Sequence, residues 1–433
     1  MNENKISVGI LPGREIRFRL NGSFRHGERA YDGEYSVTSD AGTLLLRQGE
    51  AVERLPDDFL LEPGTETDTF DLAGVVIGTR FHWERAEEQR FRGALSFVRE
   101  GEEIVAVNIL SLEDYLTSVI SSEMNANAPP EFLKAHAVIS RGWLLAQREK
   151  KTGDEGQQAG NEGELVRWFD CRQHSLYDVC ADDHCQRYQG VGRENAAAAQ
   201  ATRDTRGEVL LYDGKVCDTR FSKCCGGVTE RFDTAWEDRF HPYLVKVDDR
   251  SDGVPSPDLR VEENARAWIL STPAVDCNAG GEVLAGVLND YDRETRDFFR
   301  WTVTYPAGEL SALVESRLHA GLGDLLDLQP VERGVSGRIV RLRLVGTRGS
   351  LVIGKELLIR RALSRSHLYS SAFVVTVDRD KTGHPSRFIL RGAGWGHGVG
   401  LCQIGAAVMS ARGYSYREIL SRYFPGTRLT TIY

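Results

Sequence analysis

The chain of 433 residues carries 54 Lys and Arg against 63 Asp and Glu, a net charge of −9, so a nucleic-acid partner is not expected, because phosphate binding needs a basic surface. Hydrophobic residues make up 41% and charged residues 27%, a composition typical of globular proteins with real cores. No run approaches the roughly 18 apolar residues of a membrane helix. We therefore expect two or three globular domains and no transmembrane segment.

The first 110 residues predict a strand-rich region. Short runs that alternate apolar and polar residues are separated by Gly, Asn and Asp, as in strands joined by turns. The start of the chain alternates like an edge strand and lacks the apolar core of a signal peptide, so no export signal is predicted. The strands are expected near residues 7–11, 15–20, 35–39, 73–83, 93–100 and 103–110.

Residues 112–124 predict a helix with one carboxylate in an unusual place. At about 100° per residue the apolar side chains share one face, and Glu123 projects onto the centre of that face. It also lies at the helix C-terminus, where the dipole disfavours an anion. Both surroundings favour the neutral acid, and a Glu protonated near neutral pH is what a general acid must be. The alternative is a Glu that ends the helix and faces solvent.

A second helix is predicted from Pro130 to about residue 150, because Pro is favoured in the first helical turn. The two helices should pack as a hairpin. Lys134 and Arg141 lie seven residues apart on one face of the second helix. Such a pair is usually a solvated stripe, but in the hairpin it would come near Glu123. Since a cation lowers the pKa of a neighbouring carboxyl, we expect Arg141 to orient the carboxylate or the substrate.

A Cys-rich segment follows, and it predicts a metal site. His174, Cys180, His184 and Cys185 form the pattern H-x5-C-x3-H-C, and thiolate and imidazole are the ligands that tetrahedral zinc prefers. His174, Cys180 and Cys185 are the first three ligands expected. Because adjacent residues seldom both bind one ion, Cys171 or the distant Cys224 is an alternative to His184 or Cys185. A disulfide or free buried thiols remain the other interpretation.

The rest of the chain predicts mixed helices and strands. The last segment is expected to run strand, glycine loop, helix, helix, strand. Upstream of it, helices are expected at 194–202 and near 308–320, and strands at 207–212, 215–222, 337–345, 350–353 and 372–378.

Residues 392–400 carry glycine at every second position, with Trp395 and His397 displayed between the glycines. A dinucleotide-binding fingerprint is not expected, because the residues after the glycines do not provide the βαβ unit that this fingerprint requires. Alternating glycines indicate backbone held against backbone or ligand. The Trp395 ring is then either a stacking face for a sugar or part of the core. The Gly-Gly pair that follows Cys224 and Cys225 predicts either a simple turn or a loop that lines a cleft.

Four sequence strings together resemble the SpoIID/LytB family, which comprises stage II sporulation protein D and the amidase enhancers. They are LEDYLTSVISSEM, FLKAHAVISR, GWGHGVGLCQIGA and GYSYREILSRYFPGT. The resemblance covers residues 104–149, 207–240 and 388–430. It implies a peptidoglycan lytic transglycosylase that cleaves MurNAc-β-1,4-GlcNAc bonds of peptide-stripped glycan strands to 1,6-anhydro ends. It also implies a location in the cell envelope, outside the cytoplasm.

The resemblance further implies roles for individual residues. Glu123 matches the catalytic acid/base, and Lys134 and Arg141 match the basic positions of the next helix. Some members bind zinc through a His/Cys cluster like the one at residues 174–185, where a structural role is expected. Lys223 stands near the expected cleft, where relatives have a small hydroxyl residue, and joins Trp395 and His397 as a substrate-binding candidate.

We therefore predict an α+β protein with a strand-rich body, a helical hairpin that carries Glu123, and a C-terminal Gly-rich loop at the same cleft. Two other functions stay open: a non-catalytic glycan-binding activator of a cell-wall amidase, and a zinc hydrolase that uses the 174–185 cluster. The expected domains are a β-rich region at 1–103, a SpoIID-like core at 104–249 with its Cys/His loop at 167–190, an insertion or second lobe at 250–380, and the rest of the core at 381–433.

Overall fold

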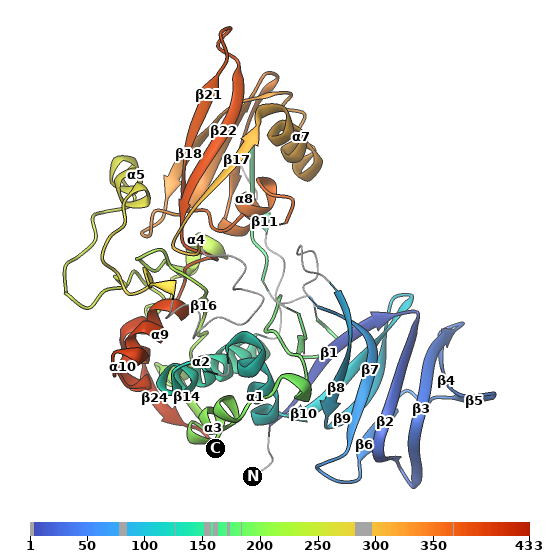
Figure 1. Ribbon diagram of the computed structural model, residues 1–433. Helices are drawn as coiled ribbons and strands as arrows, with labels where there is room; N and C mark the ends of the chain where they lie inside the picture. Colours follow the sequence, from blue (N-terminus) through green and yellow to red (C-terminus); the bar gives the residue numbers. More distant parts are fainter. Residues whose placement is uncertain are drawn as a thin grey trace. The chain divides into compact units, whose positions relative to one another are not determined.

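The protein is a mixture of helices and strands with a strand-rich body, as predicted (Figure 1). It divides into two compact units, each described by itself. Unit 1 comprises residues 1–126, 171–207 and Tyr433, and unit 2 comprises residues 127–170 and 208–432. The computed structural model describes residues 4–77, 85–125, 127–150, 157–158, 163–170, 174–182, 184–281, 297–366 and 368–433.

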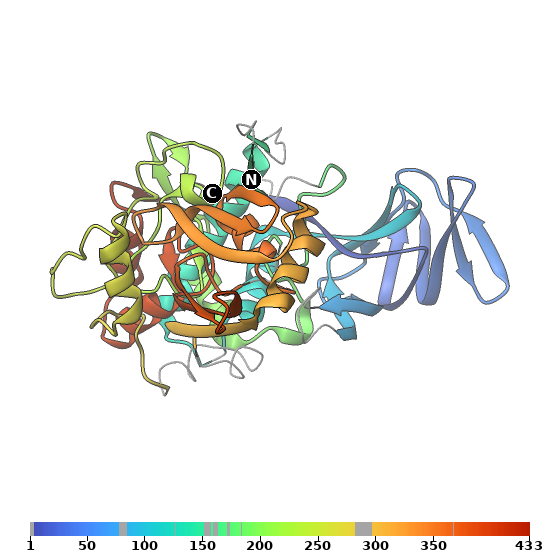
Figure 2. The same ribbon diagram turned by 90° about the horizontal axis from the view of Figure 1, so that it is seen from above.

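Unit 1 is built on a sheet that has eleven strands among the described residues (Figures 1 and 2, blue to green). The pairs are antiparallel except for β13, which runs parallel to β1. The alternation of apolar and polar residues follows the two faces of the sheet: Ile16 and Phe18 of β2 are buried, whereas Arg17 between them is exposed. The strands are β1 Lys5–Gly13, β2 Glu15–His26, β3 Arg29–Asp40, β4 Thr43–Gln48, β5 Ala51–Arg54, β6 Leu60–Pro63, β7 Thr69–Ile77, β8 Arg85–Arg92, β9 Ala94–Glu100, β10 Glu103–Ser111 and β13 Val179–Cys180. The strand predicted at 73–83 is described as far as Ile77.

Helix α1 (Leu112–Glu123) continues directly from β10. The pair Ser111 and Asp114 resembles a capping box and so predicts the start of the helix. The hydroxyl of Ser111 indeed accepts a hydrogen bond from the backbone N–H of Asp114 at 3.1 Å and caps the helix. The helix ends at Glu123, one residue from the predicted limit. The short helix η1 (Val191–Arg193) and helix α3 (Ala196–Asp204) pack against α1 within unit 1.

A row of aromatic rings in contact joins the sheet of unit 1 to α1. It runs from Phe70 through Phe91 and Tyr188 to Tyr115, with successive ring centroids 5.6, 5.7 and 5.3 Å apart. The hydroxyl of Tyr188 also donates to Oδ1 of Asn108 in β10 at 2.6 Å. Since such rings bury large areas at fixed geometry, α1 is held rigidly on the sheet.

Unit 2 contains four small sheets among its described residues. Their orders are β11–β12–β20–β19–β18, β17–β22–β21, β15–β14–β24 and β16–β23. The main apolar core of the unit includes Trp301, Leu342 and Phe388, and helices α7 (Ala307–Leu318) and α8 (Glu356–Ala362) pack against it. The strands are β11 Gln157–Gln158, β12 Glu164–Arg167, β14 Glu208–Tyr212, β15 Lys215–Val216, β16 Phe221–Ser222, β17 Arg300–Pro306, β18 Leu325–Arg333, β19 Ile339–Gly346, β20 Gly349–Gly354, β21 Phe373–Arg379, β22 Pro385–Ala393, β23 Leu401–Cys402 and β24 Arg428–Thr431.

At the C-terminus, β22, helix α9 (Gln403–Ala411), helix α10 (Tyr416–Tyr423) and β24 follow the predicted order of strand, loop, helix, helix, strand, and the two-residue strand β23, which was not predicted, precedes α9. Residues 150–166 are polar and Gly-rich and predict an exposed loop. This prediction was wrong for residues 164–166, which belong to strand β12 and pair with β20 far along the chain. Residues 151–156 and 159–162 of that expected loop lie outside the described residues. The helices are α2 Pro130–Glu149, α4 Phe232–Ala235, α5 Glu262–Leu270, α7 Ala307–Leu318, α8 Glu356–Ala362, α9 Gln403–Ala411 and α10 Tyr416–Tyr423. Among the described residues, none of the helices combines the length and apolar character needed to span a membrane.

Acid should destabilise unit 2 through a buried histidine of α2. His136 is fully buried, with its ring nitrogens 3.2 Å from Ser140 Oγ and 3.0 Å from Gln403 Nε2. Burial lowers the pKa of His136 to about 3, whereas an unfolded chain titrates near 6.5. Because the unfolded chain binds the extra proton between these values, the free energy of unfolding should fall by about 1.4 kcal/mol per pH unit through this group as the pH drops from 6 to 4.

Urea unfolding of the wild type and of His136→Met at pH 7, 6, 5 and 4 measures this effect. The wild type should lose more stability per pH unit than the variant, by the amount that one proton contributes. Equal slopes would mean that His136 is not the acid-sensitive group.

Candidate functional site

Glu123 is the last residue of α1 and is only partly buried. Its Oε1 accepts a hydrogen bond from the backbone N–H of Arg187 at 3.2 Å. Arg187 follows Cys185 by two residues, so the segment that contains the expected metal ligands also fixes this carboxylate. A carboxylate that is oriented by the backbone and still reachable is suited to proton transfer.

The segment that follows the expected metal ligands runs along α1 and is hydrogen-bonded to it. Tyr115 donates from its hydroxyl to Oε1 of Gln186 at 3.2 Å. Ser118 donates to the carbonyl of Gly190 at 2.9 Å, and Ser121 accepts from the N–H of Asn195 at 3.2 Å. The last two turns of α1 are therefore fixed by their neighbours, which a catalytic side chain needs.

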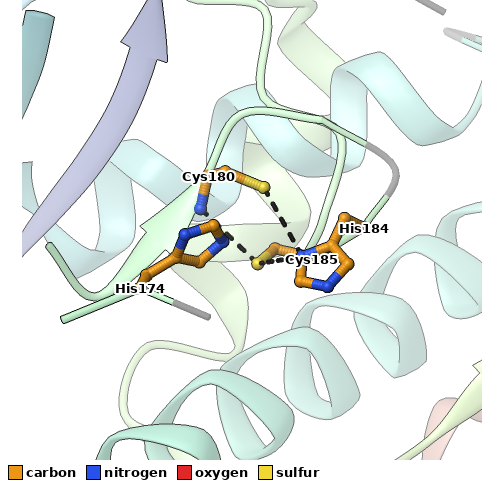
Figure 3. Close-up of side chains that lie close together, drawn as sticks. All are labelled: His174, Cys180, His184 and Cys185. Carbon is orange, nitrogen blue, oxygen red and sulfur yellow. Dashed lines mark hydrogen bonds between the residues drawn. The ribbon is translucent and has the colours of Figure 1, made fainter. Parts of the chain in front are cut away.

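The four expected metal ligands, His174, Cys180, His184 and Cys185, lie together in unit 1 (Figure 3). One ligand atom from each lies within 4.8 Å of the other three. Nδ1 of His184 is 3.9 Å from the sulfur of Cys180 and 3.7 Å from that of Cys185. Ligands at zinc distances of roughly 2.0–2.3 Å in a tetrahedron would lie about 3.5–3.8 Å apart. The spacing therefore fits one tetrahedral ion, including the adjacent pair of His184 and Cys185.

Two further observations suit a metal here. Nε2 of His174 is buried and has no hydrogen-bond partner among the described residues, so its nitrogen is available. Hydrogen bonding, first with Cys185 and also with His184, holds the pKa of the Cys180 thiol far below its usual value despite burial. The thiolate is the form that binds metal. Of the alternative ligands, Cys171 lies outside the described residues and Cys224 belongs to unit 2.

The other candidate residues lie in unit 2, and two of them are on α2. Lys134 is partly exposed and donates from Nζ to Oε1 of Glu131 at 3.1 Å. Arg141 is completely buried, and its Nη1 donates to the carbonyl of Glu208 in β14 at 2.9 Å. Arg141 thus joins α2 to β14 within unit 2. The predicted hairpin and the predicted contacts of both cations with substrate stay predictions.

The glycine loop lies against residues 220–230 of the same unit. Cys224 pairs with Trp395 and Glu230 with Val399, and strand β16 runs parallel to β23. A Cβ on Gly394 would lie 2.7 Å from the carbonyl oxygen of Cys224, and one on Gly400 would lie 2.0 Å from that of Arg220. Both glycines also have positive φ, of 76° and 74°. No other residue allows this close approach of two backbones.

The loop presents a ring and a neutral imidazole. The partly exposed Trp395 ring contacts Phe298 and Tyr369, with centroids 4.8 and 4.7 Å apart. Nδ1 of His397 accepts a hydrogen bond from the N–H of Val399 at 3.0 Å. Burial, together with nearby guanidinium groups, lowers the pKa of His397 well below its usual value. His397 is then neutral with its proton on Nε2, a hydrogen-bond donor.

Lys223 lies within the segment 220–230 that faces the glycine loop, and it is partly exposed. Its carbonyl accepts a hydrogen bond from the N–H of Ile404 at 3.2 Å, in the first turn of α9. Its backbone therefore has a structural role, while its ammonium stays a candidate for binding substrate.

Sequence reasoning missed a buried ionic cluster beside the glycine loop. Arg220 donates to Asp218 at 2.8 Å and to Asp170 at 3.1 Å, and its guanidinium lies 4.2 Å from the Trp236 ring centre. Burial would raise the pKa of Asp218, but Arg220 and Lys150 hold it well below its usual value. The members come from three separate segments, so no local pattern marked them. The N–H of Arg187 was missed because a backbone donor has no signature in the residue type.

Comparison with known proteins gives two family matches. Residues 100–212 match the family described as stage II sporulation protein, and residues 230–400 match a domain of unknown function, DUF8618. The SpoIID match includes α1 and the His/Cys cluster of unit 1.

Curated relatives are similar over most of the chain. An uncharacterized protein of Brachyspira hyodysenteriae is 26% identical over 336 residues, which are 78% of this chain and 71% of that protein. The amidase enhancer of Bacillus subtilis is 26% identical over 325 residues, 73% of this chain and 40% of that protein. Stage II sporulation protein D of Bacillus subtilis is 23% identical over 325 residues, 75% of this chain and 76% of that protein.

These findings define residues 100–212 as a SpoIID domain. This domain and the similarity to relatives named stage II sporulation protein D and amidase enhancer support the SpoIID/LytB family, as the four sequence strings predicted. It spans about two fifths of the length of the amidase enhancer.

Proposed function

We propose that the protein acts on the bacterial cell wall, outside the cytoplasm, as a lytic transglycosylase that cleaves MurNAc-β-1,4-GlcNAc bonds of peptide-stripped peptidoglycan strands. The observation that carries the proposal is the Glu123 carboxylate, partly exposed at the end of a rigid helix and held by the N–H of Arg187. The names of the relatives, an amidase enhancer and a sporulation protein, support a role in cell-wall processing.

The reaction needs only one carboxyl group. Glu123 in its acid form protonates the glycosidic oxygen as the bond to C1 of the muramic acid breaks, and the leaving sugar departs with a new hydroxyl. The C6 hydroxyl of the same muramic acid attacks C1 of the oxocarbenium-like centre, and the Glu123 carboxylate accepts its proton. The 1,6-anhydro ring closes, no water is consumed, and Glu123 returns to its acid form.

We further propose that residues of unit 2 bind the glycan. Trp395 offers a ring face that suits the apolar face of a sugar. The neutral His397 would line the sugar site beside this ring, and Lys223 and Lys134 can pair with the lactyl carboxylate of muramic acid that peptide removal exposes. Arg141, which is completely buried, would act through its position in α2.

The His/Cys cluster is proposed to hold a structural zinc ion. Four protein ligands complete a tetrahedron, so the ion has no open position for a water, and this speaks against a zinc hydrolase. The ion would fix the loop whose continuation, Arg187, holds Glu123. Chelation should therefore lower the melting temperature first and the activity only as a consequence.

The second candidate function is a glycan-binding activator of a cell-wall amidase, without cleavage. The 26% identity with an amidase enhancer favours it. In that case glycan binding and amidase stimulation would survive replacement of Glu123, because no proton transfer is involved.

Mass spectrometry of peptide-stripped glycan strands incubated with the protein tests the proposal. The expected products carry 1,6-anhydro-muramic ends. Products heavier by one water would support hydrolysis instead, and glycan binding without any product would favour the amidase activator.

A further inference from the structure

A second cluster of buried thiols lies in unit 2. Cys224, Cys225, Cys277 and Cys402 are at most 3% exposed, and Asp249 beside them is completely buried. They come from four separate parts of the chain. Cys224 and Cys225 directly precede the Gly-Gly turn, Asp249 lies in a loop, Cys277 lies in the loop after α5, and Cys402 directly precedes α9. Free thiols packed against a buried carboxylate are a costly arrangement unless something binds them.

We propose that Cys225, Asp249, Cys277 and Cys402 bind one Zn²⁺ ion. One ligand atom from each lies within 4.8 Å of the other three, and the sulfur atoms of Cys225 and Cys277 are 3.7 Å apart. Thiolates bound to one zinc ion at about 2.3 Å in a tetrahedron lie about 3.8 Å apart. A cluster of several iron atoms would occupy the space between the sulfurs and hold them further apart, so the spacing favours a single ion.

Backbone N–H groups already point at the expected ligand atoms. The N–H of Cys225 donates to the sulfur of Cys402 at 3.2 Å, and that of Gly227 donates to the sulfur of Cys225 at 3.4 Å. Asp249 accepts from the N–H of Cys277 at 2.8 Å and from the Tyr423 hydroxyl at 2.6 Å. Such donors orient metal ligands and favour their ionised form.

The Gly-Gly pair explains how the chain reaches this geometry. Gly226 and Gly227 have φ of 81° and 108°, and a Cβ on Gly227 would lie 2.8 Å from the Trp268 ring. Only glycine tolerates both the conformation and the space. The turn brings the N–H of Gly227 back to the sulfur of Cys225.

Two guanidinium groups offset the negative charge that three thiolates and a carboxylate would leave on the site. Arg338, completely buried, donates to the carbonyl of Cys225 at 3.2 Å. Arg300 donates to the carbonyl of Gly226 at 3.2 Å. Four ligands would again complete the coordination, so the ion would be structural and would join the Gly-Gly turn to the start of α9.

Zinc content of the purified full chain, prepared with reductant, tests the proposal. The expected value is two ions per chain, one in each cluster. Cys277→Ser should lose one ion, and the matched control Cys217→Ser, a buried cysteine outside the cluster, should keep both. A wild type that holds one ion, lost in Cys180→Ser and kept in Cys277→Ser, would overturn the proposal.

Two measurements use proteins that carry no substitution in unit 2, so they do not depend on how Cys277→Ser folds. The double variant His174→Ala, Cys180→Ser, reconstituted with Co²⁺, should still bind one ion and show thiolate-to-cobalt charge transfer in the near ultraviolet. The wild type, unfolded with chelator and no reductant, should show all eight of its thiols. The zinc site would be refuted if the double variant bound no cobalt. It would also be refuted by a count of six thiols in which a disulfide joins two of Cys225, Cys277 and Cys402.

Discussion

Glu123→Gln should abolish glycan cleavage and leave glycan binding intact. The amide keeps the size of the side chain and can still accept from the N–H of Arg187, so the end of α1 should keep its structure. It cannot donate and then recover a proton. General acid–base catalysis contributes typically 10²–10⁴-fold, and because Glu123 is proposed to act in both steps, we expect a loss of at least about 10³-fold in kcat. Release of anhydro-muramic ends over time measures the rate.

Glu149→Gln is the matched control, because Glu149 is likewise the last residue of a long helix, α2, but is exposed. It should cleave at the wild-type rate. A Glu123→Gln protein that binds the glycan and still releases anhydro ends would remove Glu123 from the mechanism. An inactive wild type that stimulates an amidase equally well with Gln at position 123 would favour the activator function.

Local patterns in the sequence predicted the elements that carry the candidate site. The Ser111 cap and the apolar period located α1, the Pro pair located α2, and the H-x5-C-x3-H-C spacing located four side chains that do meet. Each of these signals lies within one short stretch of chain. The structure adds what such a stretch cannot contain, such as the backbone N–H of Arg187 that holds Glu123.

The second cluster shows why a single sequence does not predict a site whose residues lie far apart in the chain. Cys224 and Cys225 were noticed because they precede a Gly-Gly pair, but Cys277 and Cys402 are far from them in the chain and Asp249 looks like one of many acidic residues. Only the fold brings them to one place. The same holds for strand β12: the polar, Gly-rich segment around it predicts a loop, and only the pairing with β20, far along the chain, makes it a strand.

Glu230 also contacts residues that are far from it in the sequence, and it joins two parts of unit 2. Its side chain is completely buried. Oε1 accepts from the N–H groups of Arg231 and Val335 at 2.8 and 3.1 Å, and Oε2 accepts from the N–H and hydroxyl of Ser336 at 3.0 and 2.7 Å. Its own N–H donates to the carbonyl of Gly398 at 2.8 Å. Glu230 thus joins the turn after β18, through its carboxylate, to the glycine loop, through its backbone N–H.

Both Glu230→Ala and Glu230→Gln should destabilise unit 2 by at least about 3 kcal/mol, since each buried donor left without an acceptor costs about 1–3 kcal/mol. Alanine leaves four donors unpaired, and glutamine turns an NH₂ group towards one pair of donors that need an acceptor. The control is Glu332→Gln, an exposed Glu two residues before the same turn, which should stay within about 0.5 kcal/mol of the wild type. Urea unfolding midpoints measure all three variants. A Glu230→Gln protein as stable as the wild type would show that the turn does not depend on a carboxylate. We expect the loss of stability because four donors converge on this side chain, and only a carboxylate has enough lone pairs to accept from all of them.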